Sequence, residues 1–165
     1  MTISDAVPLP WASSLESSAT RGSSAEPRVL GTVNSLEFRV GPERSPAQVV
    51  HSSRRFATMV LPALLGELPQ AETLAQQVLA VLTELVDVTA RHRGSVDLGG
   101  RISRDEGHVL VTVGEMGRPL PDPGEEPGLF LVQRLVDDIG QYRGEEGGYT
   151  TWASVPARSH FGGLM

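Results

Sequence analysis

Hydrophobic and polar residues alternate in several short segments of this chain. Residues 36–40 place apolar side chains at every second position between charged ones, which predicts a half-buried strand. The same pattern occurs at residues 96–103 and 109–113, which are separated by an Asp-Glu-Gly sequence typical of a hairpin turn. Residues 141–143 and 149–155 flank a Glu- and Gly-rich turn and predict a second hairpin.

Other segments carry apolar residues at helical spacing. Ser45 followed by Pro46 is a typical N-cap and first turn, and Pro62 and Gly66 are expected to end that helix. One apolar face of this helix is predicted from Val49, Val50, Phe56 and Val60.

A longer helix is predicted from Glu72 to about Arg91, because its apolar residues form one stripe. The stripe consists of Leu74, Val78, Leu82, Leu85 and Thr89. Residues 114–127 are rich in proline and glycine and predict a loop. A third helix is expected from Gly128 to about Ile139.

The predicted order of elements is β-α-α-β-β-loop-α-β-β. Helices that alternate with hairpins favour an α/β (α+β) two-layer sandwich with a mixed, mostly antiparallel sheet and helices on one face. Its core is expected to contain the side chains of Leu82, Leu85, Val111, Val113, Leu131 and Leu135.

Domain organisation follows from composition along the 165 residues. Residues 1–33 are rich in Ser, Ala and Pro and are expected to form a disordered arm. Residues 34–156 would form the folded domain, and residues 157–165 a C-terminal tail. Trp11 is either incidental in the arm or anchors it on the domain or on a partner.

Composition excludes several kinds of chemistry. The chain has no cysteine and no lysine, so it can form neither a disulfide nor a Walker-type phosphate loop. Its net charge is −6 and no basic cluster stands out, which argues against nucleic acid as a partner. The four histidines lack metal-ligand spacing, so no metal site is expected. Without a secretory signal or an apolar run of about 20 residues, the expectation is a cytoplasmic protein without a membrane partner.

One helix carries the candidate chemistry. Glu84 lies one turn before Val88, off the buried stripe, where a carboxylate could act as a base on a hydroxyl or water. The alternative is a solvated glutamate on a helix face. Arg91 and His92 are interpreted as a solvated helix end, where cations suit the helix dipole, with a phosphate contact by Arg91 as the alternative.

Four segments together resemble the anti-sigma-factor serine kinases of the GHKL superfamily of histidine kinases and related ATPases. Residues 84–92 read Glu-Leu-Val-Asp-Val-Thr-Ala-Arg-His, where the family has Glu-Leu-Val-Thr-Asn-Ala-Val-Arg-His. Residues 111–117 correspond to the family's Val-x-Val-x-Asp-x-Gly, and residues 126–132 to its Gly-x-Gly-Leu-x-Leu-Val. Residues 148–153 correspond to Gly-x-x-x-Trp-Ala, so the resemblance covers about residues 38–155.

The resemblance implies a Bergerat-type fold with an ATP site, in which Glu84 is the candidate base. The residues implied to contact nucleotide are Val88, Glu115, Gly117, Gly128 and Leu129. It also implies a sigma factor or an anti-sigma antagonist as protein partner, and a homodimer.

Departures from the family pattern affect this site. The family's asparagine coordinates Mg²⁺, but Val88 has no ligand atom, and Mg²⁺ needs oxygen ligands. The neighbouring Asp87 is turned about 100° away on the helix. Glu115 replaces the aspartate that accepts the adenine amino group. Glu126 replaces a glycine where phosphate oxygens would approach, whereas Gly128 is kept at a helix N-terminus.

Three functions remain open from the sequence. The first is a partner-switching regulator that binds ATP weakly, with Mg²⁺ not bound in the usual mode. The second is an active ATP-dependent protein serine kinase of the same family, which the retained Glu84, Glu115 and Gly128 favour. The third is a divergent small-molecule-binding or structural domain. Loss of the Mg²⁺ ligand favours the first or third function over the second.

Overall fold

The computed structural model describes residues 34–105 and 107–157, so the predicted arm and nearly all of the predicted tail lie outside the described residues. The elements follow one another in the order β1 (Ser35–Val40), α2 (Pro46–Leu65), α3 (Ala71–His92), β2 (Leu98–Arg104), β3 (His108–Met116), α4 (Gly128–Leu135), β4 (Asp138–Arg143) and β5 (Tyr149–Pro156).

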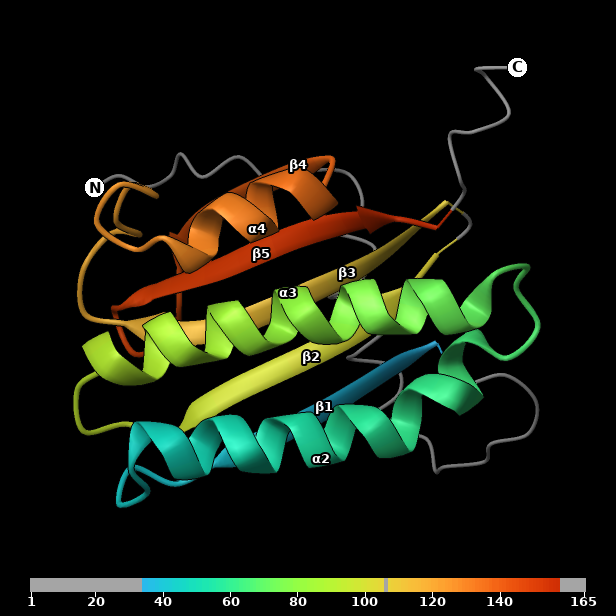
Figure 1. Ribbon diagram of the computed structural model, residues 1–165. Coiled ribbons are helices and arrows are strands. Elements are labelled where there is room, and N and C mark those ends of the chain that lie inside the picture. Colours follow the sequence, from blue (N-terminus) through green and yellow to red (C-terminus); the bar gives the residue numbers. More distant parts are fainter. Residues whose placement is uncertain (1–33, 106, 158–165) are drawn as a thin grey trace.

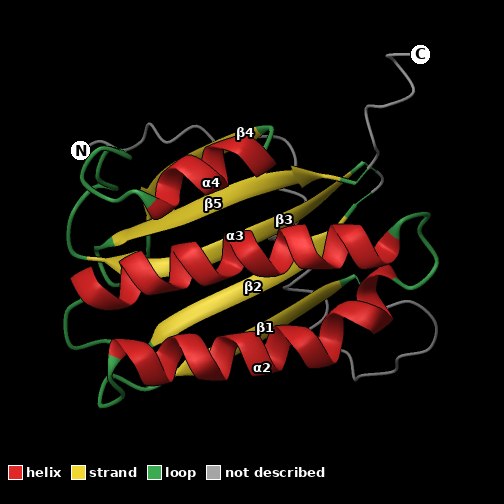
Figure 2. Ribbon diagram, in the orientation of Figure 1, coloured by secondary structure: helices red, strands yellow, loops and turns green. Residues whose placement is uncertain are grey.

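Five strands form one sheet in the order β1-β2-β3-β5-β4, and all four pairings are antiparallel. The described helices α2, α3 and α4 lie on the same face of this sheet (Figures 1 and 2). The predicted two-layer α/β sandwich with helices on one face is therefore confirmed. The sheet, which the sequence predicts to be mixed and mostly antiparallel, is antiparallel throughout.

Helix α2 begins as its sequence predicts. The Ser45 hydroxyl accepts a hydrogen bond from the Gln48 amide, and the Gln48 side chain accepts one from the Ser45 amide, which completes a capping box. Pro62 does not end the helix but lies inside its last turn, and the C-cap is Gly66. Only Val49 of the predicted apolar face is fully buried; the residues buried on α2 are Val49, Ser53, Ala57, Leu61, Leu64 and Leu65.

Helix α3 crosses the middle of the sheet and carries much of the core. All five residues of its predicted stripe are buried. They pack with apolar residues of β2, β3 and β5, among them Ile102, Val111 and Val155. Because α3 packs against the sheet and against both α2 and α4, it sets where these two helices lie on the sheet.

Helix α4 departs from the prediction at both its end and its buried face. It stops at Leu135, and Ile139 belongs to β4, where it pairs with Ala153 of β5. Leu129 and Val132, three residues apart, face the core, and Leu135 is only partly buried. Leu131 is 38% exposed, so its predicted burial is wrong. Residues 138–143 pair with β5 as a strand and do not continue the helix. Ile139, expected at the end of the helix, therefore packs against the core from β4.

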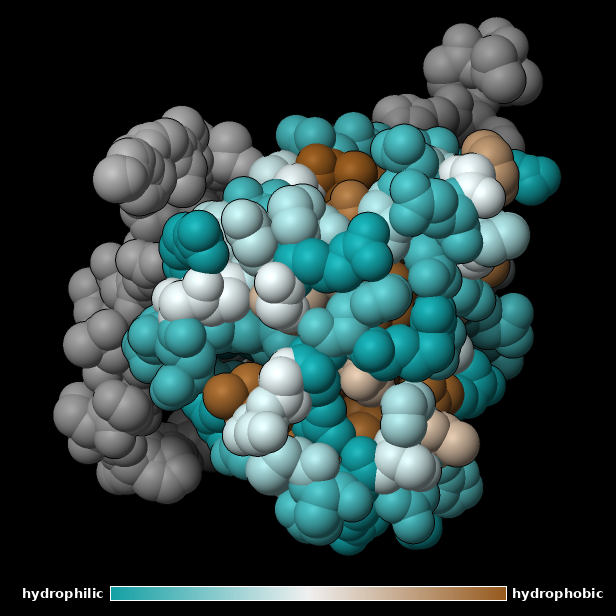
Figure 3. Space-filling view, turned by 90° about the vertical axis from the view of Figure 1, so that its left-hand side faces the viewer, coloured by the Kyte–Doolittle hydropathy of each residue, from teal (hydrophilic) through white to brown (hydrophobic). Residues whose placement is uncertain are grey.

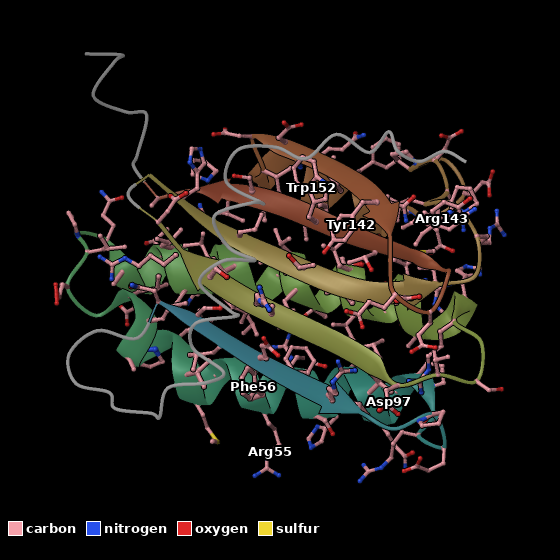
Figure 4. The ribbon with its side chains drawn as sticks, turned by 180° about the vertical axis from the view of Figure 1, so that it is seen from behind. Arg55, Phe56, Asp97, Tyr142, Arg143 and Trp152 are labelled. Carbon is pink, nitrogen blue, oxygen red and sulfur yellow. The ribbon has the colours of Figure 1, made fainter. Side chains whose placement is uncertain are left out.

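The other face of the sheet carries aromatic side chains. Figure 4 shows this face, with Tyr142 and Trp152 labelled on β4 and β5. A side chain in place of Gly140 would collide with the Trp152 ring, so the indole lies directly over that glycine. By strand alternation, Arg143 and Tyr149 lie on the opposite side of these strands from Tyr142, and the Arg143 guanidinium stacks on the Tyr149 ring at 4.5 Å. Within residues 34–105 and 107–157, none of the helices has the length and apolarity needed to cross a membrane.

Candidate functional site

The C-terminal half of α3 meets the first turn of α4, and this contact brings two of the predicted site residues together. The Glu84 carboxylate lies so close to Gly128 that a Cβ at that position would overlap it. A glycine is therefore required for the observed approach, because any other residue would push the carboxylate away. Glu84 is partly buried as a result.

Partial burial changes the acid–base properties of Glu84. Its pKa is raised above the usual value, mainly because burial disfavours the charged form, and the carboxylates of Asp87 and Glu126 add to the rise. Arg91 opposes this shift. A carboxylate with a raised pKa is a stronger base, so this part of the site keeps an acid–base group.

Arg91 joins two segments that are far apart in the sequence. Its guanidinium donates to Asp87 Oδ2 at 3.0 and 3.2 Å, one helical turn away on α3. It also donates to both carboxylate oxygens of Glu126, at 2.6 and 3.0 Å, from the loop before α4. Arg91 lies in the last turn of α3 with an exposed side chain, as the sequence predicts, and two carboxylates in addition hold that side chain.

Glu126 is the acceptor at the centre of this cluster. Its pKa is lowered, first by the hydrogen bonds from Arg91, while the nearby His92 adds to the effect. The Glu126 Oε2 and His92 Nε2 atoms are 3.6 Å apart, which is longer than a hydrogen bond. Glu84, Asp87 and Glu126 supply three carboxylates against one guanidinium, so carboxylates outnumber the guanidinium in this cluster.

Val88 lies one turn beyond Glu84 but is not on an open flank of the helix. It is 2% exposed, which corrects the prediction that this position lies off the buried stripe. An alkyl side chain without polar atoms offers no metal ligand. Across residues 34–105 and 107–157, there is also no group of three or more His, Asp or Glu side chains that could hold a metal ion.

Glu115 is bound by the turn between β4 and β5. Its carboxylate accepts hydrogen bonds from the Glu146 amide at 3.0 Å and from the Gly148 amide at 2.8 Å. A Cβ at Gly144 would overlap this carboxylate, so the turn closes tightly around it. In this arrangement Glu115 stabilises a hairpin, and an adenine contact by this residue remains a prediction.

The other two predicted residues lie on either side of the loop between β3 and α4. The Gly117 amide donates to the His92 carbonyl at 2.9 Å, which connects the start of the loop to the end of α3. Leu129 is buried and belongs to the hydrophobic core. Glu84 therefore meets Gly128 in the C-terminal half of α3, Gly117 is bound to the last residue of that helix, and the cluster around Arg91 lies on the same half.

The surface around this end of the molecule is mainly polar. Figure 3 faces the side on which α3 ends and α4 begins, and hydrophilic residues cover most of it. A cavity of about 260 Å³ lies elsewhere, where β2 turns into β3 and β4 begins. It is lined in part by Ser103, His108, Leu110 and Asp137, and none of the predicted site residues contributes to it.

Sequence spacing could have identified one part of the cluster. Asp87 and Arg91 are four residues apart, a spacing that places opposite charges side by side on a helix. The pairing of Arg91 with Glu126 spans 35 residues and depends on how the loop folds back, so no local pattern indicates it.

No protein-family model matches this chain, and none of the curated proteins is significantly similar to it.

Proposed function

We propose that this protein is a regulator that resembles the anti-sigma-factor serine kinases and acts by partner switching, with a degenerate nucleotide site. Its regulatory effect would come from binding a protein, and ATP would bind weakly or not at all. The fold class, with helices on one face of an antiparallel sheet, is compatible with this proposal. The order of the four motif-like segments is its basis in the sequence.

The observation that carries the proposal is the burial of Val88. In the family that the chain resembles, this position supplies the Mg²⁺ ligand. Here the position holds a fully buried alkyl group, so it offers neither a ligand atom nor access to solvent. Phosphoryl transfer depends mainly on positioning and charge stabilisation by the metal, so loss of this ligand weakens the catalytic function most.

The charge of the cluster points in the same direction. Polyphosphate is strongly anionic, and the end of α3 presents Glu84, Asp87 and Glu126 beside a single guanidinium. Glu126 already holds that guanidinium through two hydrogen bonds. A nucleotide would have to displace one carboxylate and approach two others.

A protein partner fits the same end of the domain. Phe130 is 55% exposed on α4, and the neighbouring Leu131 is also exposed. Aromatic side chains such as that of Phe130 are enriched at protein–protein interfaces. The resemblance supports a sigma factor or an anti-sigma antagonist as the partner, and a homodimer as the assembly.

An active protein serine kinase is the second candidate, and Glu84 favours it. Its raised pKa and its place at the N-terminus of α4 suit a base that acts on a hydroxyl. This candidate requires Mg²⁺ to be held without a ligand from position 88, by one or two carboxylates together with the phosphates.

A phosphotransfer assay separates the two candidates. Purified protein would be incubated with radiolabelled ATP, Mg²⁺ and candidate antagonist proteins, in parallel with a Glu84→Ala variant. We expect slow or undetectable phosphorylation by both proteins, with antagonist binding retained. Robust phosphorylation that disappears in Glu84→Ala would establish the kinase and exclude the degenerate site.

A further inference from the structure

The open face of the sheet, opposite the three described helices, carries an uncharged row of side chains across its strands (Figure 4). Strand register places four residues of this row side by side: Ser35, Ser103, Leu110 and Ser154. The core residues Ile102, Val111 and Ala153 are their neighbours along the strands and face the helices. Because side chains alternate along a strand, the row faces away from the helices.

This row is closed to solvent, although the described helices all lie on the other side of the sheet. Ser103 is 1% exposed, and Leu110 and Ser154 are each 7% exposed. The solvent face of an antiparallel sheet normally carries exposed polar side chains, so a buried leucine there needs a cover. The same three residues line the cavity of about 260 Å³. The row is therefore apolar at its centre and hollow beside it.

The chain that precedes the described residues joins the sheet at one end of this row. The Arg104 amide donates to the Asn34 carbonyl at 2.9 Å, and the Ser35 and Ser103 hydroxyl oxygens are 3.3 Å apart. Residues 1–33 are thus attached beside the cavity. Adjacent strands lie about 4.8 Å apart, and an extended residue spans about 3.3 Å. The 22 residues between Trp11 and Asn34 can therefore reach any strand of the sheet.

One part of residues 1–33 has the composition to cover an apolar row. Residues 6–15 contain no charged side chain. Val7 and Leu9 each precede a proline, which favours an extended backbone, and an extended backbone places Val7, Leu9 and Trp11 on one side. The two prolines lack an amide hydrogen, so this segment suits the surface of a sheet better than its interior. Their fixed φ also reduces the entropy that the segment loses when it docks.

We propose that residues 7–11 dock on the open face of the sheet of their own chain, with the Trp11 ring against Leu110 and Trp152. Trp152 borders the row, because it lies on the same face two residues before Ser154. Docking of this segment explains why Leu110 is closed to solvent on a face that the described helices leave open. The sequence leaves two roles for Trp11, and the open face selects anchoring on the domain. The docking is independent of the proposed function.

Acrylamide quenching of tryptophan fluorescence tests the docking. The chain has two tryptophans, so a Trp152→Phe variant keeps an aromatic ring on the face and leaves Trp11 as the sole emitter. The quenching constant of Trp11 should be at least about threefold lower in the folded variant than in the same variant unfolded by denaturant, because a docked indole loses most of its accessible surface. Equal quenching in the folded and the unfolded variant would overturn the docking.

A substitution on the face tests the location. In the Trp152→Phe background, Leu110→Ser should raise the quenching constant of Trp11 at least about twofold, because it removes the apolar contact. The matched control is Met59→Ser on α2, on the helical side of the sheet, where Met59 is 70% exposed. This control should leave the constant unchanged. A Trp11 ring that stays equally shielded in Leu110→Ser would overturn the location.

The reciprocal measurement leaves every residue of the folded domain unchanged. Trp11→Ser and Trp11→Phe both make Trp152 the sole emitter, and the phenyl ring of Trp11→Phe still covers the face. The quenching constant of Trp152 should be at least about twofold higher in Trp11→Ser. Equal constants would overturn the contact between the two rings. Shielding that appears only at high protein concentration would place the segment on a second copy and overturn docking within one chain.

Discussion

Val88 and Glu126 are the two side chains that most clearly separate this site from the nucleotide site that the sequence resembles. Under the proposed resemblance, Val88 puts a buried alkyl group where the family has a metal ligand, and Glu126 puts a carboxylate where the family has a glycine beside phosphate. The sequence alone identifies both substitutions. It does not indicate that Val88 is enclosed by the fold, because the helical pattern placed it off the apolar stripe.

A Val88→Asn substitution should lower the free energy of unfolding by about 2 kcal/mol, because it buries an amide without a hydrogen-bond partner. The matched control is Gln76→Asn, which places the same side chain at an exposed position of α3 and should cost about 0.5 kcal/mol. Denaturant titration of both variants measures the difference. Equal costs would mean that position 88 is open to solvent, as a working ligand position would be.

In α3, α4 and the loop that precedes α4, apolar packing and charge pairing hold different parts together. Core residues of α3 and α4 set how the helices pack, whereas Arg91 and Glu126 connect α3 to the loop before α4. The strand alternation and the long apolar stripe of α3 predicted their elements well, since both patterns extend over several repeats. The eight residues of α4 span little more than two turns, so their pattern did not settle which leucine faces inward.

The register of α4 can be measured by two neighbouring truncations. Val132→Ala should lower the free energy of unfolding by about 1–2 kcal/mol, because it removes buried methyl groups and leaves a cavity. Leu131→Ala removes a larger but exposed side chain and should cost about 0.5 kcal/mol or less. Thermal or denaturant unfolding of the two variants measures both changes in the free energy of unfolding. A larger cost at Leu131 would restore the orientation that the sequence first suggested.

The pairing of loop and helix should also depend on pH. The pKa of Glu126 is lowered in the folded protein, so its ionised form contributes stability above the unfolded value of 4.5. This contribution is lost as the pH falls through the lower folded value, because the protonated carboxyl no longer pairs with Arg91. Glu84 acts in the opposite sense, since its raised pKa makes ionisation unfavourable as the pH rises.

Stability curves of the native protein and Glu126→Gln isolate this effect. The difference between the two unfolding free energies should be constant above about pH 5 and should shrink as the pH falls below 4.5. Chemical denaturation between pH 3 and pH 7 provides the measurement. A difference that grows toward low pH would show that Glu126 is not held as an anion.

For the molecule as a whole, the two-layer architecture followed from the order of periodic segments, because each segment needs a partner to cover its apolar face. The cluster at the end of α3 did not follow, because it joins residues 35 positions apart through a loop without a regular period. Glu115 illustrates the same limit. Its carboxylate closes a hairpin more than 30 residues away in the sequence, a role that its motif position gave no reason to expect.

The most direct test of a degenerate nucleotide site on this fold is calorimetric titration of ATP into the native protein, with Mg²⁺ and again with a chelator. Because Val88 provides no ligand, the affinity for ATP should be undetectable, or equal within about threefold under the two conditions. Tight binding that is lost when the chelator removes Mg²⁺ would contradict the account, because it would require a metal site that the buried Val88 cannot supply.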